Sequence, residues 1–431
     1  MITEKVEIEI AGGLSLALPK MLRVKQKFNA DAIHDVAHAT EEALRKPEIR
    51  EKIKAGQVIA VGCGSRGIAN INVIAKSVIS ELLDLGAKPF IFPCMGSHGA
   101  ATAKGQKEVL AGYGITEETM GVPIKATMDT VVVGHLSDET PVHMDAYAAS
   151  ADGIVVINRI KPHTAFRGAT ESGLTKMLAI GIGKINGAAT YHRHGMDMFP
   201  ELLPEVRDVN IKNRNVLFGV GIVENAYDHT KIIEAIPAEK IAEREPVLQA
   251  LAKENMPRLN FPSVDVLIID EMGKNISGAG FDPNITGRNR RAVDWKSDLD
   301  VKKIVVLGLT PESHGNATGI GGADVTTMKL FNQMDVAATY ANVITSMNLD
   351  GAAIPIVMNN DNEAINLAVK TVVRTAPENC KIIRIRNTLS LGEIFVSENL
   401  LDTVQSNSSF FEIISDAKPF AFDADQNLEA F

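Results

Sequence analysis

The sequence contains little cysteine, a single tryptophan and no long apolar run. Its three cysteines, Cys63, Cys94 and Cys380, show no C-x-x-C spacing among the 431 residues. A set this sparse and odd in number predicts a reducing compartment rather than a disulfide framework. No apolar run approaches the roughly 18 residues of a membrane span, and the first residues, MITEKVEIEIAGG, lack the regions of a signal peptide. We therefore expect a cytoplasmic protein that does not enter a membrane.

Basic residues are also fewer than acidic ones. The 44 lysines and arginines are outnumbered by 53 acidic residues, so the formal net charge is -9. Binding to a nucleic-acid backbone needs clustered lysine and arginine, and we therefore expect no nucleic-acid partner. A weak overall field does not exclude a small anionic substrate, because one local cation can outweigh it.

Strand-like and helix-like runs alternate along the chain. QVIAVGCGSRG and KPFIFPCMGSHG are each followed by a stretch with helical periodicity. This alternation predicts an α/β fold with mostly parallel sheets, and 431 residues exceed one ordinary core. With 256–265 as a linker, we predict a catalytic domain over 1–262 and a second domain over 263–394 that closes an active-site cleft. Residues 395–431 are a candidate addition to the first domain.

Three of the predicted strands end in polar, reactive side chains. VIAVGCGSRG, FIFPCMGSHG and IVVINRIKPH bring Arg66, His98 and His163 to strand ends. Ligands bind outside the carboxyl ends of the strands in open α/β sheets. Because imidazole ionises near neutrality, two such histidines suggest a general acid/base pair, and a guanidinium can grip a carboxylate. The alternative for each histidine is a purely structural role.

The segment GCGSRG, 62–67, matches the G-x-G-x-x-G pattern of dinucleotide-binding turns. That fingerprint also needs an acidic residue at the end of the next strand, and FIFPCMGSHG has none there. An NAD-dependent oxidoreductase is therefore an alternative reading. The other reading is a tight strand-to-helix turn whose N–H groups approach an anion.

Lys176 and His192 stand sixteen positions apart at either end of a glycine-rich run. At ~100° per residue they would lie about 160° apart on a continuous helix. A break at Gly181, Gly183 or Gly187 would let the chain aim both at one point. The alternative is a small-residue helix packed on a sheet, with the lysine extending outward to solvent.

A histidine follows His192 two positions later in YHRHG. His192 and His194 would share a face, and could share a metal, only in an extended conformation. No third ligand of obvious spacing follows, so a zinc hydrolase site is the weaker reading.

The segment KPHTAFRGATESGLTKMLAIGIGKINGAATYH, with GSRG and GSHG upstream, resembles the nickel-pincer-nucleotide-dependent lactate racemase family. The resemblance implies an isomerase that racemises or epimerises a 2-hydroxyacid. It implies that Lys176 holds a nickel-pincer nucleotide covalently through a thioamide and that His192 ligates the nickel. His98 and His163 would be the acid/base pair, one for each face of the substrate, and Arg66 would hold the substrate carboxylate or a cofactor group. Enzymes that make the cofactor are the implied partners.

The chain departs from the lactate racemase type in places. The segment between His163 and Lys176 is longer, which predicts a different hydroxyacid as substrate. In the second half, 270–288 matches only loosely; we assign Lys274 there to cofactor or substrate, and the glycine-rich loop 313–324 to the cleft lining. Trp295 fits either a core or a cleft wall. A non-catalytic binding protein that keeps the scaffold is the third alternative.

Overall fold

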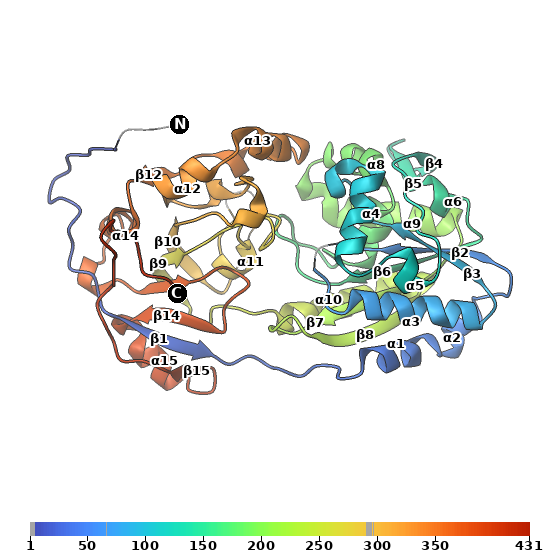
Figure 1. Ribbon diagram of the computed structural model, residues 1–431, viewed down its shortest axis with the longest axis horizontal. Coiled ribbons are helices and arrows are strands. Elements are labelled where there is room, and N and C mark those ends of the chain that lie inside the picture. Colours follow the sequence, from blue (N-terminus) through green and yellow to red (C-terminus); the bar gives the residue numbers. More distant parts are fainter. Residues whose placement is uncertain (1–4, 66, 290–294, 296) are drawn as a thin grey trace. The chain divides into compact units, whose positions relative to one another are not determined.

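The computed structural model describes residues 5–65, 67–289, 295 and 297–431 (Figure 1). The chain divides into two compact units, which are described separately. Unit 1 comprises Met1–Phe28 with Pro257–Phe431, and unit 2 comprises Asn29–Met256. Both contain mostly parallel sheets flanked by helices, which confirms the predicted α/β class. No helix in the described ranges is both long and apolar enough to span a bilayer.

Unit 2 is built on a sheet with the strand order β3-β2-β6-β7-β8. Its strands are parallel except for β7 and β8, which pair antiparallel. The sheet strands are β2 (Val58–Cys63), β3 (Lys88–Pro93), β6 (Gly153–Arg159), β7 (Val216–Glu224) and β8 (Thr230–Pro237). A separate antiparallel ribbon joins β4 (Thr130–His135) and β5 (Pro141–Asp145). The strands ending in GCGSRG, CMGSHG and NRIKPH are thus neighbours, with their carboxyl ends at one edge.

Both faces of this sheet are covered. Alternate residues of β6 join two different apolar clusters, Ile154 and Val156 in one and Val155 and Ile157 in the other. This explains why the strand sequences are continuously apolar rather than alternating. The helices of unit 2 are α1 (Val36–Leu44), α2 (Pro47–Arg50), α3 (Ile71–Asp84), α4 (Ala103–Gly112), α5 (Glu117–Met120), α6 (Ala146–Ala149), α7 (Leu174–Lys176), the π-helix η2 (Met177–Gly181), α8 (Lys184–His192), α9 (Phe199–Asn213) and α10 (Ile241–Asn255).

Unit 1 contains a sheet with the order β12-β11-β10-β9-β13-β14-β1-β15. The first five are parallel, and the last three pair antiparallel. The strands are β1 (Met21–Gln26), β9 (Ser263–Ile269), β10 (Asp300–Val306), β11 (Val325–Thr327), β12 (Ile356–Met358), β13 (Ile382–Ile385), β14 (Glu393–Ser397) and β15 (Phe411–Ile413). The helices are α11 (Pro283–Thr286), α12 (Met328–Gln333), α13 (Val336–Thr345), α14 (Asp361–Lys370) and α15 (Leu401–Ser406).

The compact units differ from the predicted division into 1–262 and 263–394. The start of the chain belongs to unit 1 because β1 pairs on both sides, with β14 and with β15. Residues 395–431 also belong to unit 1 and do not extend the first predicted domain. The change of unit after Met256 does fall at the start of the segment interpreted as a linker.

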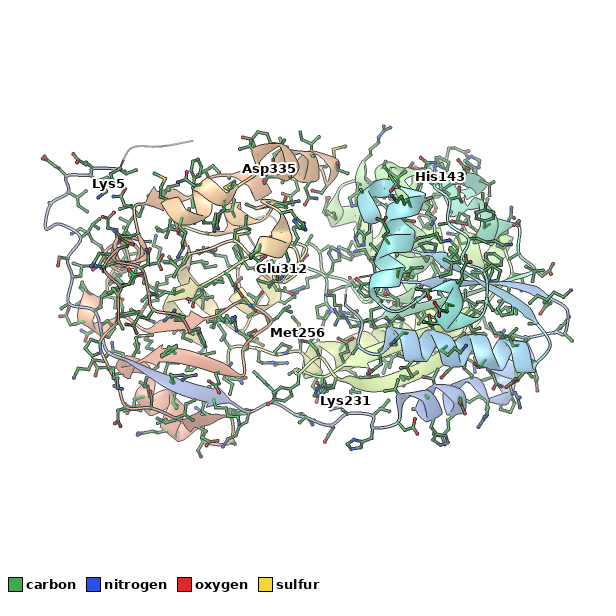
Figure 2. All side chains as sticks on the ribbon, in the orientation of Figure 1. Lys5, His143, Lys231, Met256, Glu312 and Asp335 are labelled. Atoms are coloured by element: carbon green, nitrogen blue, oxygen red, sulfur yellow. The ribbon has the colours of Figure 1, made fainter. Side chains whose placement is uncertain are left out.

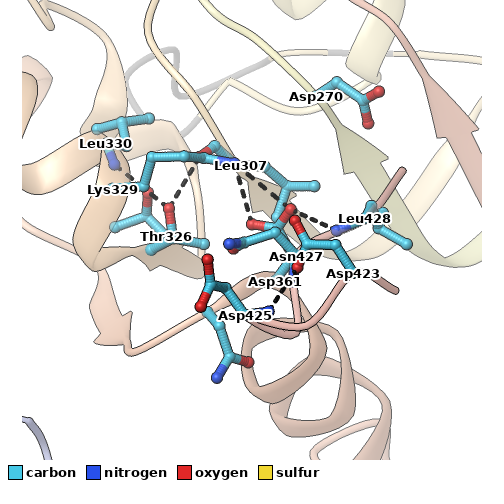
Figure 3. A network of polar contacts seen from close by, with 12 residues as sticks. Asp270, Leu307, Thr326, Lys329, Leu330, Asp361, Asp423, Asp425, Asn427 and Leu428 are labelled. Carbon is cyan, nitrogen blue, oxygen red and sulfur yellow. Dashed lines mark hydrogen bonds and ion pairs between the residues drawn. The ribbon is translucent and has the colours of Figure 1, made fainter. Parts of the chain in front are cut away.

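The end of the chain is tied to α14 by polar contacts (Figure 3). The buried carboxylate of Asp361 accepts a hydrogen bond from the backbone N–H of Leu428 at 3.0 Å and lies 3.4 Å from Lys329 Nζ. Asp423 closes the preceding turn by accepting from the N–H groups of Asp425 and Asn427, both at 2.9 Å. These bonds hold the last residues in unit 1, where sequence patterning had not placed them.

Candidate active site

Lys176 and His163 meet in unit 2. The amine Nζ of Lys176 lies 2.6 Å from Nε2 of His163, so the lysine turns toward the histidine and not out to solvent. The backbone N–H of Ala165 donates to Nδ1 of the same ring at 3.1 Å, and a neutral ring that accepts there carries its proton on Nε2. Because an ammonium has no lone pair to accept that proton, these contacts together suit an uncharged amine. An uncharged lysine is the nucleophilic form.

Glu245 from α10 holds the short helix that carries Lys176. Its fully buried carboxylate accepts from the backbone N–H of Thr175 at 2.9 Å and from its hydroxyl at 2.5 Å, and Arg207 donates to the same hydroxyl at 3.1 Å. Burial raises the pKa of Glu245, and the bonds from Thr175 and the charge of Arg207 oppose that rise. Gly173, before the helix, leaves room for this carboxylate, because a Cβ there would overlap Glu245 Oε1. Glu245 thus provides the cap that the first turn lacks.

Glu171 organises the segment that follows His163. Its side chain is fully buried and accepts from the backbone N–H of His163 at 2.7 Å. Lys253 Nζ lies 2.6 Å from this carboxylate, and Arg167 lies 3.5 Å from it while donating to the His163 carbonyl at 3.0 Å. The segment between His163 and Lys176 is therefore an internally bonded loop that fixes the histidine backbone.

A row of aromatic rings leads from this loop to His192. The ring of Phe166 lies 4.4 Å from that of His163 and 5.5 Å from that of Phe199, and Phe199 lies 5.2 Å from His192. The two contacts of Phe199 are edge-to-face, an arrangement that aromatic pairs prefer. The two histidines therefore stand at opposite ends of one packed aromatic group.

The His192 ring is held in one tautomer at the end of α8. Its Nδ1 lies 2.5 Å from the carbonyl oxygen of Ala188. A neutral ring that donates there leaves the lone pair of Nε2 free to ligate a metal. Burial lowers the pKa of His192, and the hydrogen bond to the Ala188 carbonyl opposes this. The ring is accordingly neutral at pH 7, as metal ligation requires.

His98 lies in the loop after β3, and this loop contacts the π-helix that follows Lys176. Its Nδ1 is 2.5 Å from the hydroxyl oxygen of Ser65, in the loop after β2. The backbone N–H of Gly96 donates to the carbonyl of Gly181 at 3.0 Å, which joins the His98 loop to the π-helix. Arg66, predicted to lie beside these groups, falls outside the described residues.

The predicted break between Lys176 and His192 is present. A π-helix follows α7, and α8 begins at Lys184, whose φ of 54° lies in the left-handed region. Glycine serves close packing here: a Cβ at Gly181 would come 3.0 Å from the carbonyl of Cys94, and one at Gly183 would come 2.9 Å from that of Ala179. The residue with the left-handed φ is thus Lys184, whereas Gly181 and Gly183 allow neighbouring backbone to approach closely.

The remaining predicted residues belong to unit 1. Lys274 is in unit 1, where its amine donates to the carbonyl of Gly278 at 2.7 Å and its N–H donates to Ser313 Oγ at 2.9 Å; the loops 270–288 and 313–324 therefore touch. Trp295 is partly buried in the same unit. The role of Lys274 in holding a cofactor or substrate stays a prediction.

A metal held by protein groups alone finds no support in the residues described. Among them there is no group of three or more His, Cys, Asp and Glu side chains that could hold an ion. His194, the candidate second ligand, contacts Thr140 Oγ1 at 3.2 Å and lies 3.8 Å from Asp138. His143, on β5, is a further histidine of this unit (Figure 2). A metal ligated mainly by an organic cofactor would need only one protein histidine and is untouched by this finding.

Comparison with solved structures defines the class of fold. The lactate racemase apoprotein from Thermoanaerobacterium thermosaccharolyticum matches with a TM-score of 0.50, covering 86% of this chain and 99% of that one. At 14% identity this likeness concerns the fold alone. Comparison with curated proteins gives no match.

The family model for the lactate racemase N-terminal domain matches residues 11–201. This match confirms the resemblance drawn from the motifs of that part of the chain. His98, His163, Lys176 and His192 all fall inside the matched range, whereas Lys274 falls outside it.

Proposed function

We propose that this protein racemises or epimerises a 2-hydroxyacid with a nickel-pincer nucleotide attached covalently to Lys176. The contact between Lys176 Nζ and His163 Nε2, 2.6 Å apart inside the matched domain, carries this proposal. A lysine with a purely structural role would require neither a fully buried glutamate that caps its helix nor a histidine in contact with its amine. Isomerase activity on a small hydroxyacid is the function that this site suits best.

The residues present fit the cofactor. Lys176, facing His163 as an uncharged amine, can form the thioamide. His192, with Nδ1 turned to a carbonyl, can offer Nε2 to nickel, for which imidazole is a suitable ligand. Arg66 and Lys274 are proposed to hold cofactor or substrate groups. When bound, the nucleotide supplies a reversible acceptor for the hydride on the substrate α-carbon.

His98 and His163 are proposed to move the protons. One imidazole takes the hydroxyl proton as the 2-oxoacid forms, and a histidine returns a proton to oxygen when the α-carbon is reduced again. Reversal of a stereocentre needs a proton carrier on each side of the substrate, which explains two histidines on different loops. In a thioamide the Lys176 nitrogen no longer offers a free lone pair. His163 Nε2 then becomes available to substrate.

A screen of chiral hydroxyacids tests the proposal. Protein co-produced with the cofactor-making enzymes, its expected partners, is incubated with single enantiomers of lactate, malate, gluconate and aryl lactates, and optical purity is followed. We expect at least one to lose optical purity. His98→Gln and His163→Gln should each lower turnover about 10²- to 10⁴-fold, the usual contribution of general acid/base catalysis. Full turnover in either folded variant would contradict the assignment.

A further inference from the structure

A fully buried polar group lies next to the loop that carries His98. It consists of Lys184, Asp145 and Gln106. Each side chain is 0% exposed. The amine of Lys184 lies 3.0 Å from Asp145 Oδ2 and 3.0 Å from Gln106 Oε1, and it donates to the carbonyl of Pro93 at 2.5 Å. The lysine thus donates to the Pro93 carbonyl and the Gln106 amide oxygen and forms an ion pair with Asp145, three partners from three separate segments.

The amide of Gln106 links Lys184 to the loop that carries His98. With its oxygen facing Lys184, its nitrogen donates to the carbonyl of Gly96 at 2.8 Å and to that of His98 at 3.2 Å. The loop also packs directly on α4, because a Cβ at Gly99 would come 2.6 Å from Gln106 N. The peptide group between Gly96 and Ser97 and the one between His98 and Gly99 are thereby held in place.

Stability alone does not explain this group. A buried ion pair loses hydration that its mutual attraction only partly restores, and apolar side chains of similar volume often hold a fold as well. Lys184 also adopts a left-handed φ of 54°, which is unfavourable for a residue with a side chain. This energetically unfavourable polar group ends in hydrogen bonds to the loop that carries His98. Its role is therefore to fix the position of that loop.

The same group connects the His98 loop to the Lys176 segment. Lys184 opens α8 directly after the π-helix that continues from Lys176. The backbone N–H of Asp145 donates to the carbonyl of Ile182 at 2.7 Å, so the carboxylate belongs to a strand already bonded to this turn. One buried ion pair thus serves as a common anchor for both segments.

We propose that Gln106, oriented by the Lys184–Asp145 pair, is a positioning residue that fixes the imidazole of His98. The catalytic meaning of this role rests on the proposed function. The positioning itself is a property of the protein without cofactor and is tested there.

Gln106→Leu removes both bonds to the loop and keeps the side-chain volume. Hydrogen–deuterium exchange of the backbone amides in the peptide containing Gly96 and His98 should become at least about tenfold faster, because the loop loses the two bonds that hold its carbonyls and opens more often. Carbethoxylation of His98, mapped by mass spectrometry, should accelerate several-fold, with the rates at His163 and His192 within twofold of wild type. In cofactor-loaded protein, kcat should fall at least about tenfold while KM stays within twofold.

Gln249→Leu is the matched control. Gln249 is 1% exposed in the same unit, and its amide has no hydrogen-bond partner among the described residues, so His98 should be unaffected. If Gln106→Leu does not fold, Gln106→Glu replaces it, because a carboxylate still accepts from Lys184 and cannot donate to the loop.

Unchanged exchange and unchanged His98 reactivity in either folded variant would overturn the proposal, as would equal acceleration throughout unit 2. Both readouts use the apoprotein, so a failure of the racemase assignment would leave them intact and be recognised separately.

Discussion

Gly173→Ala tests how tightly the Lys176 helix is held. A methyl group at this position would overlap Glu245 Oε1 and lie 3.1 Å from Ile160 Cγ1. Glu245 cannot yield easily, because its carboxylate is fully buried and bound to Thr175. The substitution must therefore displace either the cap or the helix.

The expected loss follows from two contributions. Losing a helix cap costs typically ~1 kcal/mol, and forcing extra volume into a packed site costs about 1–3 kcal/mol. We expect the free energy of unfolding to fall by about 2–4 kcal/mol, measured by equilibrium urea unfolding followed by far-UV circular dichroism.

Gly112→Ala is the control for the same chemical change. Gly112 ends α4, and a Cβ there would meet nothing within 4 Å. Alanine should stabilise the protein by about 0.4–1 kcal/mol, because it restricts the unfolded chain. If Gly173→Ala changes stability by less than about 0.5 kcal/mol, the size of an ordinary surface substitution, the account of the capped helix is refuted.

Two further predictions concern buried charge and pH. Lys184→Met should cost about 3–5 kcal/mol because it leaves the Asp145 carboxylate unpaired, and adding Asp145→Leu should recover most of it; additive losses in urea unfolding would contradict the pairing. Burial holds the pKa of His192 below its ordinary 6.5, so the unfolded chain binds that proton more readily. Its contribution to stability is present above about pH 6.5 and is lost as pH falls. His192→Asn should therefore flatten the decline in unfolding free energy from pH 7 to pH 5, and an unchanged slope would disprove this.

The placement of His98 and His163 could be predicted from local sequence. Both follow apolar runs that form neighbouring parallel strands, and the carboxyl ends of such strands share one edge. The break between Lys176 and His192 followed from helical geometry. These inferences needed only residue spacing and the direction of parallel strands.

The groups that hold these residues could not be predicted in the same way. Glu245 belongs to a stretch rich in charge, PAEKIAEREPVLQALAKEN, whose composition favours a solvent-exposed helix, yet its side chain is fully buried against Thr175. Gln106 and Lys184 are 78 residues apart and meet only through the tertiary fold. The pairing of β1 with β14 and β15 likewise joins the two ends of the chain, and single-strand patterning carries no signal for it.

The central claim is that the Lys176 amine is the attachment point of the cofactor. Protein co-produced with the cofactor-making enzymes is digested, and the peptide that contains position 176 is analysed by mass spectrometry, with Lys176→Arg as the matched control. The account predicts a nucleotide adduct on Lys176 in the wild type and none in the variant. An unmodified Lys176 in a preparation that nevertheless racemises its hydroxyacid would contradict it.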